Sequence, residues 1–100
     1  KDLPKDNAAI SPVIALVYRN LGDTYINLKK YNDAESAYGS GLEYTNANIP
    51  ISLKRKSTLE LRLSELYKKT KNKTLENEYA NKAVQTYRKY EEELEKKKRM

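Results

Sequence analysis

The sequence of 100 residues contains no histidine and no cysteine, and only three glycines. The chain therefore has no imidazole base, no thiol nucleophile, no disulfide and no zinc site built on these ligands. Three scattered glycines do not form a phosphate-binding loop, and no run approaches the length of about 18 apolar residues that a membrane-spanning helix needs. We therefore expect a protein that is not an enzyme and that needs no cofactor or metal.

Net charge is almost absent from the first half of the chain. Residues 1–50 hold five basic and six acidic residues, a net charge of −1, whereas residues 51–100 hold fifteen basic and eight acidic residues, a net charge of +7. The overall charge of +6 thus belongs to the second half. Such a surface can contact nucleic acid or anionic lipid, and it can equally be the solvated face of a helix.

The chain opens with Lys1-Asp2-Leu3-Pro4 and not with methionine. This opening is typical of a piece of a longer protein from which any targeting segment has been removed. We expect an intracellular protein, either cytoplasmic or, if such a segment was removed, mitochondrial.

Apolar residues recur at three- and four-residue steps, which is the period of a helix, and no segment alternates like a strand. The spacing predicts an all-α chain of four helices in two antiparallel hairpins, with the third helix from about Pro50 to Lys69. Residues 1–10 form a lead-in, 11–48 the first hairpin, 49–90 the second, and 91–100 a charged extension of the last helix.

Polar residues in the connecting segments are candidate helix caps. Ser11, followed by Pro12, is expected to cap the first helix. Asn32 is expected to open the second, with Glu35 completing a capping box. Thr74 is expected to cap the fourth.

Each helix has one apolar face that we expect to be buried. In the first helix the face consists of Ile14, Val17, Tyr18, Leu21, Tyr25 and Leu28. In the third it consists of Leu53, Leu59, Leu63, Leu66 and Tyr67, and in the fourth of Leu75, Tyr79, Ala83, Tyr87, Tyr90 and Leu94. The tyrosines at 18, 25, 31, 38 and 44 follow the seam of the first hairpin and are predicted to pack in the core rather than to stack on bases.

The two hairpins repeat each other at an offset of 42 residues. Leu21-Gly22-Asp23-Thr24-Tyr25 falls on Leu63-Ser64-Glu65-Leu66-Tyr67, and Gly41-Leu42 falls on Ala83-Val84. Small residues at 22, 34 and 41 let two helices approach closely, and the large residues beside them fill the remaining space.

The first hairpin resembles a tetratricopeptide repeat (TPR). The resemblance rests on Asn20-Leu21-Gly22-x-x-Tyr25, Tyr31, Ala34, Tyr38 and Gly41-Leu42. The period of 42 and the run Lys30-Tyr31-Asn32-Asp33-Ala34-Glu35 resemble the longer repeat of kinesin light chains. The resemblance covers about residues 12–90, and the second repeat is degenerate. It implies a fragment of an α-solenoid, a scaffold or adaptor that binds a peptide or protein partner in a concave groove.

The resemblance also implies which residues face that groove. They are Leu16, Arg19, Asn20, Asp23 and Asn27 from the first helix, with Thr58, Arg62, Glu65 and Lys69 from the third. An amide such as Asn20 can both donate to and accept from a peptide backbone, and the Arg62 fork suits a carboxylate or phosphate. Each could instead be an ordinary solvated or interhelical polar residue. We expect Asn20→Ala to abolish groove binding.

Two alternatives belong to other classes of function. The basic half could dock on RNA or on an anionic membrane, in which case affinity would fall steeply with salt; we expect nucleic acid and membrane less than a protein partner. The last helix could instead pair into a homo-oligomer through Tyr79, Ala83, Tyr87, Tyr90 and Leu94.

Overall fold

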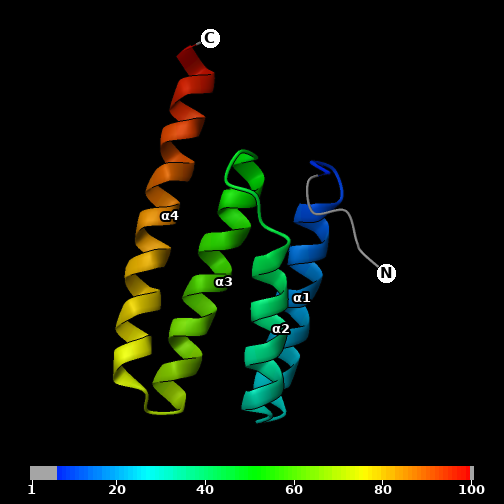
Figure 1. The fold of residues 1–100 in the computed structure, drawn as a ribbon, viewed down its shortest axis with the longest axis vertical. Coiled ribbons are helices and arrows are strands. Elements are labelled where there is room, and N and C mark those ends of the chain that lie inside the picture. Colours follow the sequence, from blue (N-terminus) through cyan, green and yellow to red (C-terminus); the bar gives the residue numbers. More distant parts are fainter. Residues whose placement is uncertain (1–6, 100) are drawn as a thin grey trace.

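The structure is a computed structural model that describes residues 7–99. Over these residues the chain forms four helices and no strand: α1 (Ser11–Asn27), α2 (Tyr31–Glu43), α3 (Pro50–Lys69) and α4 (Lys73–Arg99). Figure 1 shows the hairpin α1–α2 beside the hairpin α3–α4, with the end of α4 projecting beyond its neighbours. The prediction of an all-α fold of helical hairpins is confirmed. Of the expected lead-in, the part at 1–6 lies outside the described residues.

The turns of the two hairpins have the same backbone geometry, 42 residues apart. Lys29 and Lys71 both adopt the left-handed region, with φ of 60° and 63°. In each turn the next amide donates to the carbonyl five residues earlier at 2.8 Å: Lys30 to Tyr25, and Asn72 to Tyr67. This bond and the left-handed residue form the Schellman arrangement that ends a helix. The offset of 42 is therefore present in the backbone.

These turns also decide where the following helices begin. The predicted caps Ser11, Asn32 and Thr74 are wrong: Ser11 Oγ has no partner, and the other two lie inside their helices. Asn72 instead accepts a backbone amide from the first turn of α4 at 3.1 Å, and Asn7 accepts two amides ahead of α1. Helices α2 and α4 each begin two residues after the left-handed lysine, so Asn32 and Thr74 lie inside their helices, past the capping position.

The core lies where the first hairpin meets α3. Its buried residues are Ala15, Ala34, Tyr38, Leu59, Leu63 and Leu66, with tyrosines of both hairpins packed around them. A Cβ at Gly22 would collide with the Tyr38 ring, so the ring packs directly on the α1 backbone. The close approach that the small residues indicated, and the core role of Tyr38, are both confirmed.

The buried face of α1 differs from the predicted one. Val17, Leu21 and Leu28 are exposed, whereas Ala15 and Gly22 are buried. The small residues let α2 approach α1 closely, so they, and not the larger aliphatic residues, face the core. In α3 the four predicted leucines are buried as expected.

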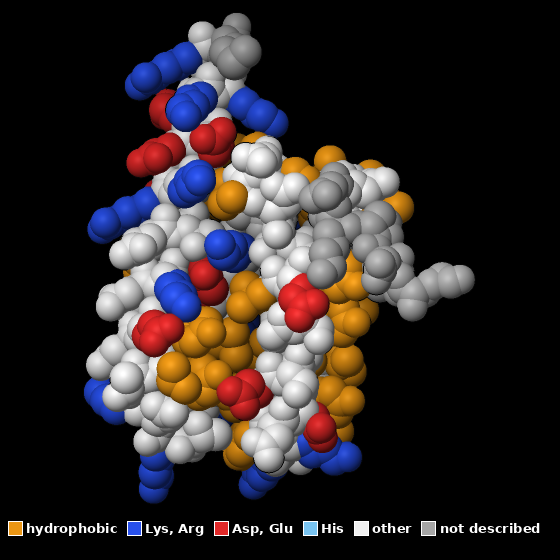
Figure 2. Space-filling model, in the orientation of Figure 1, with side chains coloured by type: hydrophobic (Ala, Val, Ile, Leu, Met, Phe, Trp, Pro, Cys, Tyr) orange, Lys and Arg blue, Asp and Glu red, His pale blue; other side chains and the backbone are white. Residues whose placement is uncertain are grey.

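Helix α4 is mostly solvent-exposed. It contacts α3 alone among the described helices, and Ala83 is its one fully buried residue. Tyr79 packs on the core, but Tyr87 and Leu94 are exposed, contrary to prediction, because no second helix lies beside them. Figure 2 shows Lys and Arg mixed with Asp and Glu around the projecting end. None of the helices described is long and apolar enough to cross a membrane.

Candidate functional site

A hollow of about 360 Å³ opens where α1, α2 and α3 meet. Five of the predicted groove residues line it: Asp23, Asn27, Arg62, Glu65 and Lys69. The remaining lining residues are Ile26, Tyr38 and Leu66. Because both α1 and α3 are the first helix of their hairpin, and each ends at the same point of the 42-residue repeat, their last turns come together side by side.

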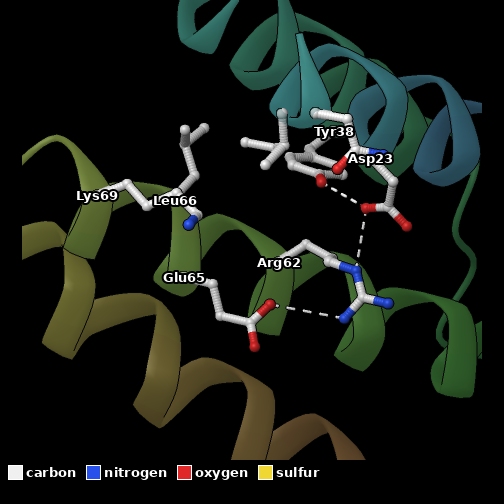
Figure 3. Close-up of a pocket in the computed structure, with 8 residues that line it drawn as sticks. Asp23, Tyr38, Arg62, Glu65, Leu66 and Lys69 are labelled. Carbon is white, nitrogen blue, oxygen red and sulfur yellow. Dashed lines mark hydrogen bonds and ion pairs between the residues drawn. The ribbon is translucent and has the colours of Figure 1, made fainter. Parts of the chain in front are cut away.

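Arg62 lies at the centre of a polar network in this hollow (Figure 3). Its Nε donates to Asp23 Oδ1 at 3.0 Å, and its Nη1 lies 3.6 Å from Glu65 Oε1. The Tyr38 hydroxyl donates to the same Asp23 oxygen at 2.5 Å. The guanidinium fork therefore already binds carboxylates of its own chain. Arg62 ties α3 to α1 and forms one wall of the hollow.

The Tyr38 hydroxyl donates a hydrogen bond to Asp23 in this network. Burial raises the pKa of its hydroxyl well above the ordinary value, and the hydrogen bond to Asp23 raises it further. Both effects favour the protonated phenol, which is the form that donates to Asp23. This contact fixes the position of the Asp23 carboxylate on the hollow's wall.

Two polar side chains in the hollow remain available. Asn27 and Lys69 are exposed, and neither has a hydrogen bond or ion pair with another residue of the described part of the chain. The Asn27 amide can donate to and accept from a peptide backbone, and the Lys69 ammonium can pair with a carboxylate. Ile26 and Leu66 offer apolar contact beside them. The site can therefore hold an extended polar chain.

The other predicted site residues lie elsewhere. Asn20 is exposed and accepts a hydrogen bond from Arg19 Nη2 at 2.9 Å, and neither residue lines the hollow. Leu16 is half-buried outside the hollow, and Thr58 lines a groove on the far side of α3. The prediction for Asn20 thus loses its geometric basis.

Three lining residues were missed as part of the site. Ile26 follows Asp23 by three residues, and Leu66 follows Arg62 by four, so each lies on the same helical face as its polar neighbour. That spacing could have identified both. Tyr38 was assigned to the core, and one edge of its ring also reaches the hollow.

A second hollow, also of about 360 Å³, lies across α2, α3 and α4 and holds a buried carboxylate, Glu60. Its Oε1 has no partner. Burial raises the pKa of Glu60, while a hydrogen bond from Thr86 and the charges of Lys56 and Lys82 oppose that shift. No second acidic residue lines this hollow, so it lacks the carboxylate pair that acid–base chemistry uses.

Comparisons with known proteins add no constraint on this site. No family model, curated protein or solved structure matches the chain. Between residues 7 and 99 there is also no group of three or more His, Cys, Asp or Glu residues placed to hold a metal ion. The function is therefore inferred from the side chains that line the hollow between α1 and α3.

Proposed function

We propose that this chain is a non-enzymatic, TPR-like helical scaffold that binds an extended peptide segment of a protein partner in the hollow between α1 and α3. One observation carries the proposal. Residues from α1 and α3 meet in a single hollow, where Asn27 and Lys69 remain unpartnered beside apolar Ile26 and Leu66.

The charges in the hollow suggest which peptide it binds. Asp23 and Glu65 are balanced by Arg62 and Lys69, and Arg62 is already paired. Of the two cations that line the hollow, Lys69 is free to meet a partner, which favours an acidic side chain on the peptide. Ile26 and Leu66 favour an apolar residue next to it. The expected ligand is therefore an extended segment in which an acidic residue neighbours aliphatic ones.

Fluorescence anisotropy with labelled peptides tests this proposal. One series carries Glu beside Leu, and a matched series carries Lys in place of Glu. We expect binding of the Glu series and at least a tenfold loss of affinity, about 1.4 kcal/mol, on Lys69→Glu or Asn27→Ala. Lys89→Glu makes the same charge change on an exposed position of α4 and should leave affinity within about twofold. Equal loss in Lys69→Glu and Lys89→Glu would contradict the proposal.

Salt dependence separates this function from the electrostatic alternative. Several lysines of the basic half already pair on their own helix, including Lys82 with Glu78 at 3.1 Å and Lys96 with Glu93 at 3.3 Å. Peptide binding should weaken less than about tenfold between 50 and 200 mM salt, whereas contact with six to ten phosphates would cost about 10³ to 10⁵. A steep fall with an RNA oligonucleotide as the probe would favour the alternative.

A further inference from the structure

The outer side of α1 carries an exposed apolar stripe that consists of Ile10, Val13, Val17, Leu21 and Leu28. Val17 is 59% exposed and Leu21 is 40% exposed. The two lie opposite Ala15 and Gly22, which face α2 inside the hairpin. We call this surface the α1 stripe. Figure 2 shows hydrophobic side chains along the edge of the molecule where α1 lies.

The other edge of the molecule carries an apolar groove of about 570 Å³ between α3 and α4. Leu61, Val84 and Tyr87 line it and are 45%, 50% and 44% exposed, with Ala83 at its base. Successive positions on a helix are about 100° apart, so Leu61 points nearly opposite to Leu59, which faces the first hairpin. We call this surface the α3–α4 groove.

The molecule already contains one contact of the kind that would join these two surfaces. Leu59 of α3 packs against the first hairpin, where its methyl carbons lie 3.1 Å from the position a Cβ would take on Gly41. Subtracting the 42-residue offset from Leu59 gives Val17, and adding it to Gly41 gives Ala83. Val17 on the α1 stripe therefore corresponds to Leu59, and Ala83 in the α3–α4 groove corresponds to Gly41, the residue that Leu59 packs against.

The same offset extends along both surfaces. Leu63, which is buried against the first hairpin, corresponds to exposed Leu21. Leu42, which packs on the core, corresponds to Val84 in the groove. The α1 stripe is thus the repeat equivalent of a buried surface of α3, and the α3–α4 groove is the equivalent of the surface that covers it.

We infer that the chain assembles head to tail, with the α1 stripe of one copy seated in the α3–α4 groove of the next. Charge favours this arrangement over pairing of two last helices. Residues 1–50 carry a net charge of −1 and residues 51–100 carry +7, so a head-to-tail contact joins a nearly neutral half to a basic one, whereas an α4–α4 contact joins two basic ones. A heterologous contact does not close on itself as a dimer, so the assembly grows into rings or open chains.

Sedimentation velocity of the 100-residue chain tests this inference. The average mass should rise with concentration past that of a dimer. Val17→Glu blocks the stripe and Val84→Glu blocks the groove, and both positions are exposed, so circular dichroism should remain unchanged. Each variant alone should stay at the monomer mass of 11.6 kDa. Ser36→Glu, on the exposed surface of α2 and outside both surfaces, should assemble like the parent chain.

Mixing the two blocked variants distinguishes head-to-tail assembly from other contacts. The Val17→Glu chain keeps its groove and the Val84→Glu chain keeps its stripe, so an equimolar mixture should form a heterodimer of twice the monomer mass and stop there. A parent chain that stays monomeric at all concentrations would overturn the inference. It would also be overturned by a Val17→Glu chain that assembles like the parent, or by a mixture that stays monomeric.

Discussion

The two hairpins have the same turn geometry and differ in the side chains that pack between their helices. In the first, Gly22 lies against the buried Tyr38 ring. At the corresponding positions the second has Ser64 and Ala80, and the Ser64 hydroxyl donates to the Glu76 carbonyl at 2.8 Å. A small residue faces a large one in the first hairpin, and the second has two small residues at the corresponding positions. The turn geometry is thus sufficient to maintain the hairpin while the contact between its helices changes.

A second pair of corresponding positions differs in polarity. Tyr18 and Tyr44 stack in the first hairpin, with ring centroids 5.9 Å apart. Forty-two residues later the same positions hold Glu60 and Thr86, a buried carboxylate and a hydroxyl that bonds to it. The second hairpin therefore has polar side chains where the first has aromatic ones.

The largest expected effect comes from breaking the contact specific to the first hairpin. Gly22→Ala should lower the free energy of unfolding by about 3 kcal/mol, because the new methyl group collides with the Tyr38 ring. Urea denaturation measures the change. Gly39→Ala is the matched control: no atom lies within 4 Å of its new methyl, so it should raise stability by about 1 kcal/mol through helix propensity.

A double variant sharpens the same comparison. Gly22→Ser with Tyr38→Ala rebuilds the pair that the second hairpin uses. Its loss of stability should be smaller than the sum of the two single losses, since the serine occupies space that the ring vacates. Additive losses would mean that the two residues do not restrict each other.

The polar contact of the second hairpin should make its stability depend on pH. Burial raises the pKa of Glu60 above the ordinary 4.5, so the folded protein holds this proton more tightly, and stability falls as pH rises between the unfolded and folded values. Glu60→Gln should be more stable than the parent at pH 7 by about 1 kcal/mol and equally stable below pH 4.5.

Urea denaturation at both pH values measures this difference. Glu92→Gln, on the exposed end of α4, is the control and should change stability little at either pH. A Glu60→Gln variant that differs from the parent equally at pH 4 and pH 7 would show that the carboxylate's charge has no part in the effect.

The smallest expected effect tests what the hairpins have in common. Lys29→Gly and Lys71→Gly should each raise stability by about 0.5 to 1 kcal/mol, because glycine adopts the left-handed region without the Cβ clash of lysine. Thermal unfolding measures both. Because the two turns have the same geometry, the two gains should agree. A gain at one turn alone would show that the turns are not equivalent.

The sequence predicted the repeating parts of the fold best. The bounds of α3 and the offset of 42 follow from apolar spacing and matched short motifs, which record local geometry. The caps were wrong because several polar residues stand in a row, as in Asn72-Lys73-Thr74, and the turn before them decides which one meets a free amide. The left-handed conformation of Lys29 and Lys71 could not be predicted from the sequence, since glycine is the usual residue in that conformation.

The predicted buried face of α1 was wrong, and the partners of the site residues could not be predicted, because tertiary contacts decide both. Val17 and Leu21 have the spacing of a buried face, but periodicity does not show which side of a helix is covered. For Arg62 the sequence left a ligand-binding fork and an ordinary solvated or interhelical residue open, and its partner Asp23 lies 39 positions earlier in the chain. Such a pairing depends on how α3 packs against α1, which no local pattern encodes.

Helix α3 contacts all three other described helices, and the core residues come from α1, α2 and α3 together. The first hairpin would lose Leu59, Leu63 and Leu66 from its core if the second were removed. The second hairpin has four buried leucines, and three of them, Leu59, Leu63 and Leu66, belong to the core shared with the first hairpin. We therefore expect the two hairpins to unfold together, because cutting the chain between α2 and α3 would divide the core residues between the two pieces.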